Sequence, residues 1–152
     1  MNEFKLFEDK LAGLIACLSP AARRRMTTEI AKQLRASQQQ RIKRQQAPDG
    51  TPYAARKRQP VKGKKGRVKR EMFTKLRTNR YMKAKGTNEA AVVEFVGRVQ
   101  RMARVHQEGL KDKPNRYSEG VQYEARPLLG LGNSDKKMIE DTFFCHCCKH
   151  FM

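Results

Sequence analysis

The spacing of apolar residues predicts two helices at the start of the chain. Residues 3–18 carry apolar side chains at intervals of three and four, which is the period of one helical face. Ser19-Pro20 ends this helix and starts another, because serine is a favoured N-cap and proline suits the first helical position. The second helix is expected over Pro20–Gln45. Its apolar stripe fades after Ala36, so residues 37–41 should project into solvent or lie on a partner.

A turn and a basic segment follow the second helix. The run Pro48-Asp49-Gly50-Thr51-Pro52 predicts a turn, since proline fixes φ and glycine supplies a positive φ. Residues 54–69 are almost devoid of apolar side chains and are interrupted by glycine and proline. We therefore expect them to form an extended, flexible basic loop that orders only on a partner.

Short strands and helices are predicted after the basic loop. Arg70–Thr78 is interpreted as a short helix, and Arg80–Ala84 as a strand. Ala90–Gly97 is rich in β-branched and aromatic residues and should form a second strand. The turn residues Gly86-Thr87-Asn88 lie between the two strands, so an antiparallel hairpin is expected.

The rest of the chain completes an α+β pattern. Apolar positions between Val99 and His106 have helical spacing, residues 110–120 are interpreted as a loop, and Val121–Tyr123 as a short strand. A last helix is expected over residues 136–142. The predicted fold is α+β, with N-terminal helices, a small antiparallel sheet and further helices in a single domain, and with an extended basic loop.

Charge and composition indicate a chain that needs a partner. Of its 152 residues, 38% are hydrophobic and 32% charged, which is lean for a globular monomer. The net charge is +19, and residues 20–85 hold 22 of the 34 lysines and arginines against only Glu29, Asp49 and Glu71. Such a block attracts nucleic acid, anionic lipid or an acidic protein surface, or else remains a solvated arm. Tyr53 is the only aromatic residue between Ala47 and Lys69, so contact with DNA would be non-specific.

Candidate chemistry is sparse. No nucleophile motif or phosphate-binding loop is present, and a lone helical histidine such as His106 is usually a packing or capping residue, so we expect neither catalysis nor a cofactor. Cys145 and Cys148 have CxxC spacing, and His150 could add a third zinc ligand. A structural zinc site needs four ligands and usually two separated pairs, so the alternative is a C-terminal tail without metal.

The chain is also expected to be a cytoplasmic product. No apolar run approaches the roughly 18 residues that a membrane span needs, and the N-terminus lacks the features of a secretory signal. The clustered cysteines do not resemble a disulfide framework.

The order of several short motifs resembles the phage virion morphogenesis family over roughly residues 5–142. The first motif comprises Arg41, Gln45 or Gln46, Pro48, Asp49, Gly50 and Tyr53. The basic helix expected at 70–78 follows. The second motif comprises Met102, Ala103, His106, Gln107 and Gly109. The third is the Ala125-Arg126-Pro127-Leu128-Leu129-Gly130-Leu131 run, before a helix capped near Asp135. Met102 replaces a usual aromatic residue, and the Cys-rich end lies outside the family pattern.

This resemblance implies a structural virion protein without enzymatic activity. Residues 1–142 would form a tail-completion domain that includes the loop 54–69, and residues 143–152 a Cys/His-rich tail. The protein would complete or terminate the phage tail at its head-proximal end and take part in head–tail joining. It would form a homo-oligomeric ring, six-fold like the tail tube, and meet tail tube, sheath and head–tail connector or neck proteins. It would lie in the virion tail or neck after assembly in the host cytoplasm.

The resemblance gives the motif residues an architectural role. Gly109 would follow a helix at its C′ position, and Arg126-Pro127 would set a rigid turn, because the residue before proline is held extended. Two other readings remain: a small basic, non-specific nucleic-acid-binding protein, and a zinc-dependent module that uses the Cys/His tail.

Overall fold

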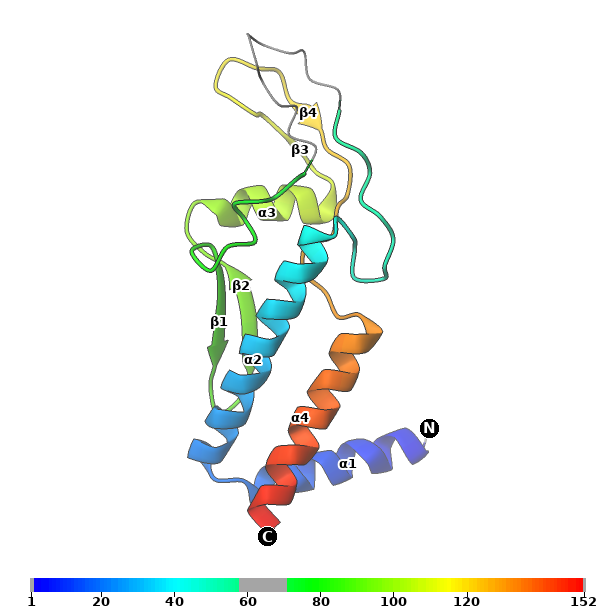
Figure 1. Cartoon of the computed structure of the whole chain (residues 1–152), viewed down its shortest axis with the longest axis vertical. Helices are drawn as coiled ribbons and strands as arrows, with labels where there is room; N and C mark the ends of the chain where they lie inside the picture. Colours follow the sequence, from blue (N-terminus) through cyan, green and yellow to red (C-terminus); the bar gives the residue numbers. More distant parts are fainter. Residues whose placement is uncertain (1, 58–70, 152) are drawn as a thin grey trace. The chain divides into compact units, whose positions relative to one another are not determined.

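The computed structural model describes residues 2–57 and 71–151, and only the backbone at Phe4, Phe7, His150 and Phe151. Within these residues, four helices and four strands form an α+β fold, as the sequence predicted (Figure 1). In chain order they are α1 Asn2–Cys17, α2 Pro20–Lys43, β1 Met82–Gly86, β2 Ala91–Phe95, α3 Val99–Glu108, β3 Lys111–Asp112, β4 Val121–Gln122 and α4 Asn133–Phe151. No described helix is both long and apolar enough to span a membrane.

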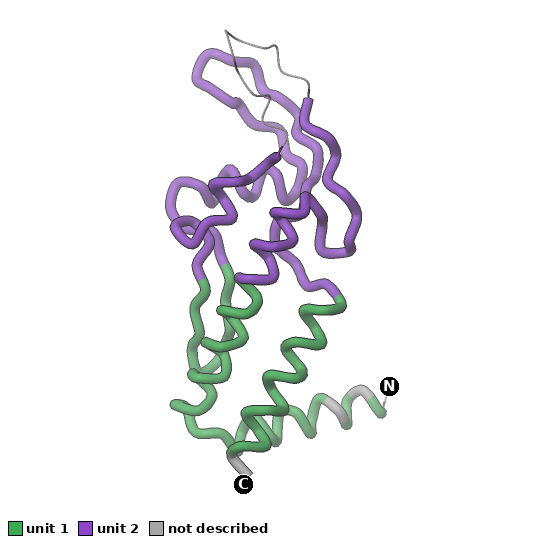
Figure 2. The backbone as a smooth tube through the Cα atoms, in the orientation of Figure 1, with its two compact units in different colours: residues 1–35, 84–93, 133–152 green, residues 36–83, 94–132 purple. Residues whose placement is uncertain are grey.

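The chain forms two compact units, each built from segments that are distant in the sequence (Figure 2). Unit 1 comprises residues 1–35, 84–93 and 133–152, and unit 2 comprises residues 36–83 and 94–132. Helix α2 and the β1–β2 hairpin contribute to both units.

Unit 1 is a helical layer around an apolar cluster. Side chains from α1, α2 and α4 pack together, and the most buried of them are Leu18, Met26, Ile30, Phe143 and Cys147. The predicted N-cap of α2 is confirmed, because the hydroxyl of Ser19 accepts the Ala22 N–H at 3.1 Å. The hairpin approaches α2 closely at Gly86, where a Cβ atom would lie 2.3 Å from the backbone nitrogen of Thr28. The Thr27 hydroxyl donates to the Thr87 carbonyl at 2.5 Å.

Unit 2 has its own apolar interior and a second hairpin. Ile42, Met82 and Leu128 are fully buried. Strands β3 and β4 pair antiparallel, with Lys111 opposite Gln122 and Asp112 opposite Val121. The strand predicted at 121–123 is confirmed, but β3 lies where the sequence predicted only a loop.

Two predicted helices differ from the structure. The described part of the segment 70–78 forms turns, and Phe73 has a φ of +65°, which a right-handed helix excludes. Helix α4 begins at Asn133 and continues to Phe151, far beyond the predicted 136–142. Its extension is stabilised because Ile139, Phe143 and Cys147, four residues apart, all pack on the apolar cluster of unit 1.

The basic loop is only partly described. Residues 54–57 have no regular secondary structure, whereas residues 58–69 of the predicted loop lie outside the described residues.

Candidate functional site

The second and third sequence motifs meet in unit 2 through Gln107. This α3 side chain binds the 125–131 segment: its Nε2 donates to the Leu129 carbonyl at 2.9 Å, and its Oε1 accepts the N–H groups of Leu128 and Leu129 at 2.7 and 2.9 Å. The amide therefore satisfies three backbone groups of an irregular segment that contains the fully buried Leu128. Gln107 therefore holds the 125–131 segment in position.

Helix α2 binds the same segment from its C-terminal half. Gln38 Nε2 donates to the Gly130 carbonyl at 2.9 Å, and Gln38 Oε1 accepts the Gly130 N–H at 3.3 Å. The Arg41 guanidinium donates to the carbonyls of Gly130 and Leu128 at 3.2 and 3.1 Å and also contacts Gln38. The expectation that residues 37–41 project into solvent or onto a partner is wrong for Gln38, which is 2% exposed. Polar side chains on a helix can be buried when nearby irregular backbone supplies their hydrogen-bond partners.

Arg126 connects the 125–131 segment to the start of the basic loop. It is 6% exposed, and its guanidinium donates to the carbonyls of Ala54 and Ala55 at 2.9 and 3.1 Å. The Tyr53 hydroxyl donates to the Pro127 carbonyl at 2.7 Å, and burial raises the pKa of Tyr53 to about 12. The chain is therefore held just before the run of lysines and arginines begins at Arg56.

Gln45 holds the chain where the described structure resumes after the basic loop. Its Nε2 donates to the Met72 carbonyl and its Oε1 accepts the Met72 N–H, both at 2.9 Å. Gln45 and Phe73 both have a positive φ, +57° and +65°, which is uncommon for residues with a side chain. Both ends of segment 56–71 are thus fixed within unit 2 by side chains of the polar framework, our name for Gln38, Arg41, Gln45, Gln107 and Arg126.

His106 packs in an aromatic stack and binds the 125–131 segment through its backbone. Its ring centroid lies 4.9 Å from those of Phe73 and Tyr123, in edge-on geometry, and its carbonyl accepts the Arg126 N–H at 2.7 Å. Burial, and secondarily the Arg126 charge, lower the pKa of His106. Nδ1 is buried and has no partner among the described residues. His106 is therefore a packing residue, one of the two roles that the sequence favoured for a lone helical histidine.

Two glycines allow the motif segments to approach each other. Gly109 follows α3 in the left-handed conformation, with φ +66°, and its N–H donates to the Val105 carbonyl. This confirms the predicted C-terminal position of Gly109. A Cβ on Gly109 would lie 2.8 Å from the Ala125 nitrogen, and one on Gly130 would lie 2.5 Å from Cγ of Pro48.

The first motif forms the predicted turn. The Ala47 N–H donates to the Thr51 carbonyl at 2.8 Å, and the Gly50 N–H donates to the Ala47 carbonyl at 2.9 Å. Gly50 has a φ of +87°, as the turn requires. The Asp49 carboxylate accepts the Thr51 N–H at 2.9 Å, and this bond lowers the pKa of Asp49. Because Pro48 contacts Gly130, the first motif also meets the third.

The sequence missed three members of this arrangement: Gln38, Phe73 and Tyr123. Gln38 could have been suspected because it lies one helical turn before Arg41 on the same face. Phe73 was expected on a regular helix, and Tyr123 at the end of a strand, so no local pattern indicated that both would enclose His106.

The candidate zinc residues do not form a ligand cluster in the described part of the chain. Cys145 and Cys148 are exposed on α4, and the His150 side chain lies outside the described residues. Cys147 is buried, and burial raises its pKa. His146 Nε2 instead lies 2.5 Å from a carboxylate oxygen of Glu29 on α2. The described residues contain no group of three potential metal ligands.

The polar motif residues thus bind mainly backbone groups, which is the geometry of a structural element. The sequence profile of the phage virion morphogenesis family matches residues 2–146, and the chain belongs to this family. It is 50% identical, over 147 residues, to tail completion protein S of Escherichia phage P2, covering 96% of this chain and 98% of that protein. No solved structure matches the chain.

Proposed function

We propose that this chain is a structural, non-enzymatic virion protein that completes the phage tail at its head-proximal end and takes part in head–tail joining. The observation that carries the proposal is the 50% identity, over nearly the whole of both chains, to a tail completion protein. The polar framework supports it, because its side chains hold irregular backbone in place and leave no reactive constellation among the described motif residues. The protein would assemble in the host cytoplasm and remain in the virion tail or neck.

A homo-oligomeric, six-fold ring is the form that we propose for this role. The chain is lean in apolar residues but still exposes several large ones, among them Leu6, Met102, Leu131 and Phe144. A head-to-tail ring would cover such side chains on every copy, since each subunit meets its neighbour through two different surfaces.

The basic loop would meet an acidic partner. Nine of the fifteen residues from Arg56 to Arg70 are lysine or arginine, and the polar framework holds the chain on both sides of them. Fixing both ends lowers the entropy that the loop loses on binding. The partner would be a tail tube, sheath or neck protein, with DNA as a non-specific alternative ligand.

Electron microscopy of a lysate from a phage that lacks this gene tests the proposal. We expect filled heads beside tails that are unattached or abnormally long. Normally joined particles would overturn it and favour the second candidate, a small basic nucleic-acid-binding protein. That candidate predicts DNA affinity that falls steeply with salt, together with an absence of binding to tails.

The architectural role of the motif is tested with Arg126→Ala. This variant leaves the carbonyls of Ala54 and Ala55 without their donor, so it should fold poorly or fail to assemble on tails. Arg116→Ala removes an exposed arginine of the same unit and is the matched control. A soluble Arg126→Ala protein with normal assembly would contradict this role.

A further inference from the structure

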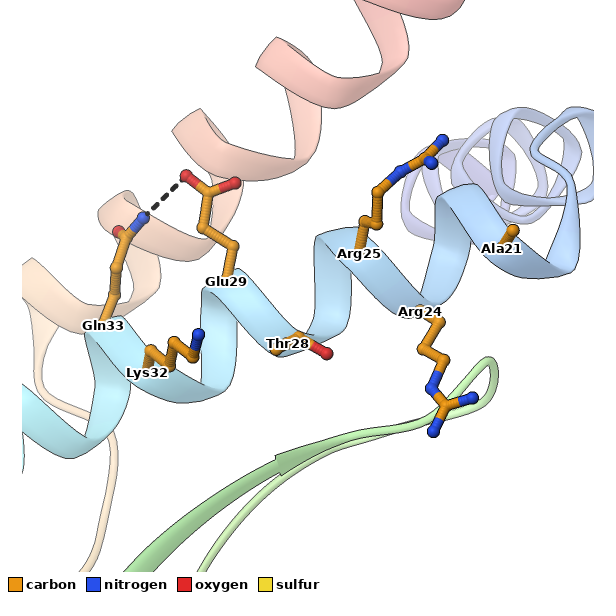
Figure 3. A pocket seen from close by; sticks show the side chains of 7 residues that line it. All are labelled: Ala21, Arg24, Arg25, Thr28, Glu29, Lys32 and Gln33. Atoms are coloured by element: carbon orange, nitrogen blue, oxygen red, sulfur yellow. Dashed lines mark hydrogen bonds between the residues drawn. The ribbon is translucent and has the colours of Figure 1, made fainter. Parts of the chain in front are cut away.

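One face of α2 in unit 1 is cationic and hollowed. A shallow hollow is lined by residues of α2 alone, on successive turns between Ala21 and Gln33. Arg24 and Arg25 leave the helix in different directions at one end, and Lys32 lies two turns further along (Figure 3). Thr28 lies between Arg24 and Lys32 along the helix and is half-buried where Gly86 of the hairpin approaches it, whereas Ala21 lies beyond Arg24 towards the start of α2. We call Ala21, Arg24, Arg25, Thr28 and Lys32 the α2 basic face.

Among the described residues that line the hollow, Glu29 is the one carboxylate, and it is already engaged. One oxygen of Glu29 accepts Gln33 Nε2 at 3.2 Å, and the other lies 2.5 Å from Nε2 of His146 on α4. In contrast, no described residue forms a hydrogen bond or ion pair with the side chains of Arg24, Arg25 or Lys32. The α2 basic face therefore presents three positive charges that no described residue neutralises.

We propose that the α2 basic face docks an acidic segment of another virion protein. Arg24 and Arg25 are seven to eight residues from Lys32, or about 11 Å along the helix, so the partner's carboxylates would be spaced by about the same distance. This inference rests on the proposed function and names the chemistry of its partner. A second copy of this chain fits poorly, because each copy carries a net charge of +19 and copies repel each other. A ring of such subunits needs acidic partners to lower that repulsion.

Nucleic acid also fits this face less well than a protein does. The Glu29 carboxylate lies between the two cationic ends and would repel a continuous chain of phosphates. A folded protein can instead place carboxylates at both ends and a neutral or donor group opposite Glu29. Three cations also supply little of the phosphate neutralisation on which non-specific DNA affinity depends.

The test uses the purified full-length protein and tails from a lysate in which this gene is inactivated. The test variant is Arg24→Glu with Arg25→Glu, and the matched control is Lys136→Glu with Lys137→Glu. Both pairs are exposed, belong to unit 1 and lie near a helix N-terminus, where glutamate is well tolerated. Circular dichroism establishes that both variants are folded. Lys32→Glu alone is the second test variant.

Co-sedimentation with these tails at low salt should be about tenfold weaker for the Arg24/Arg25 variant, several-fold weaker for Lys32→Glu, and unchanged for the control. Equal binding of all variants would overturn the inference while leaving the proposed function intact. Failure of the unmodified protein to bind tails would overturn both. Loss of DNA binding without loss of tail binding would assign the face to nucleic acid, and altered self-association in sedimentation would assign it to a second copy. Either result overturns the acidic-protein partner.

Discussion

The two units of this protein are stabilised by different kinds of contact. In unit 1, three helices pack apolar side chains onto one cluster, in which Phe143 and Cys147 of α4 meet Met26 and Ile30 of α2. Unit 2 also has an apolar interior, but its 125–131 segment is irregular, and the polar framework binds this segment and both flanks of the basic loop. Apolar packing depends mainly on volume, whereas hydrogen bonds to irregular backbone depend on donor and acceptor identity. Unit 1 should therefore tolerate substitution by shape, and the framework of unit 2 should not.

The largest expected effect is in the apolar cluster of unit 1. Phe143→Ala should lower the free energy of unfolding by about 3–5 kcal/mol, because it removes a buried ring and leaves a cavity. Phe144→Ala is the control: the adjacent ring is 44% exposed, and its loss should cost under about 1 kcal/mol. Chemical denaturation followed by circular dichroism measures both. Similar losses for the two variants would show that the cluster does not stabilise the protein as its burial indicates.

The next largest effect is expected in the polar framework, where losing the hydrogen bonds of a side chain should matter more than retaining its size. Gln107→Ala leaves two N–H groups and one carbonyl of the 125–131 segment without partners, at a cost of about 3 kcal/mol. Gln107→Leu should cost nearly as much although the size is retained, whereas Phe143→Leu in unit 1 should cost under about 1.5 kcal/mol. Gln100→Ala, at an exposed position of the same helix, should be nearly neutral. If Gln107→Leu were as mild as Phe143→Leu, the contrast between the units would fail.

The sequence predicted unit 1 better than unit 2 because apolar periodicity records only apolar contacts. The helices at 3–18 and 20–45 were predicted to within about two residues, since leucines and isoleucines recur with the period of a helix. The extension of α4 was missed because its cysteines and histidines were interpreted as possible zinc ligands, although Phe143 and Cys147 continue the buried stripe of Ile139.

In unit 2 the family resemblance identified Arg41, Gln107 and Arg126, but no pattern in the sequence indicated what these side chains bind. Their partners are backbone carbonyls and N–H groups, which residues of nearly every type carry and which a sequence pattern therefore does not distinguish. The turn of Phe73 was missed for a related reason. Its positive φ is imposed by surrounding contacts and contradicts its local preference.

Alanine substitutions at two glycines should have a smaller effect on stability, and their difference separates the cost of close packing from the cost of the backbone conformation. Gly109 and Gly97 have nearly the same φ, +66° and +65°, but only Gly109 has neighbours that a Cβ atom would meet. Gly97→Ala should cost about 1 kcal/mol for its left-handed conformation alone. Gly109→Ala should cost about 2–3 kcal/mol, because its Cβ would also displace Ala125. Equal losses in thermal or chemical unfolding would mean that the contact between α3 and the 125–131 segment is not tight.

The smallest expected effect is the pH dependence contributed by His106. Its folded-state pKa is lowered by burial and by Arg126, so the unfolded chain binds the proton more readily than the folded one. Stability is therefore fully present above the ordinary value of 6.5 and is lost as the pH falls from 6.5 towards the folded pKa. His106→Phe keeps an aromatic ring against Phe73 and Tyr123 but has no proton to gain. Unfolding measured at about pH 8 and about pH 5 should show a smaller acid-induced loss in this variant than in the unmodified protein. The other ionisable groups are shared by both proteins, so their contributions cancel in the comparison. An identical loss in the two proteins would mean that the acid sensitivity arises outside the aromatic stack.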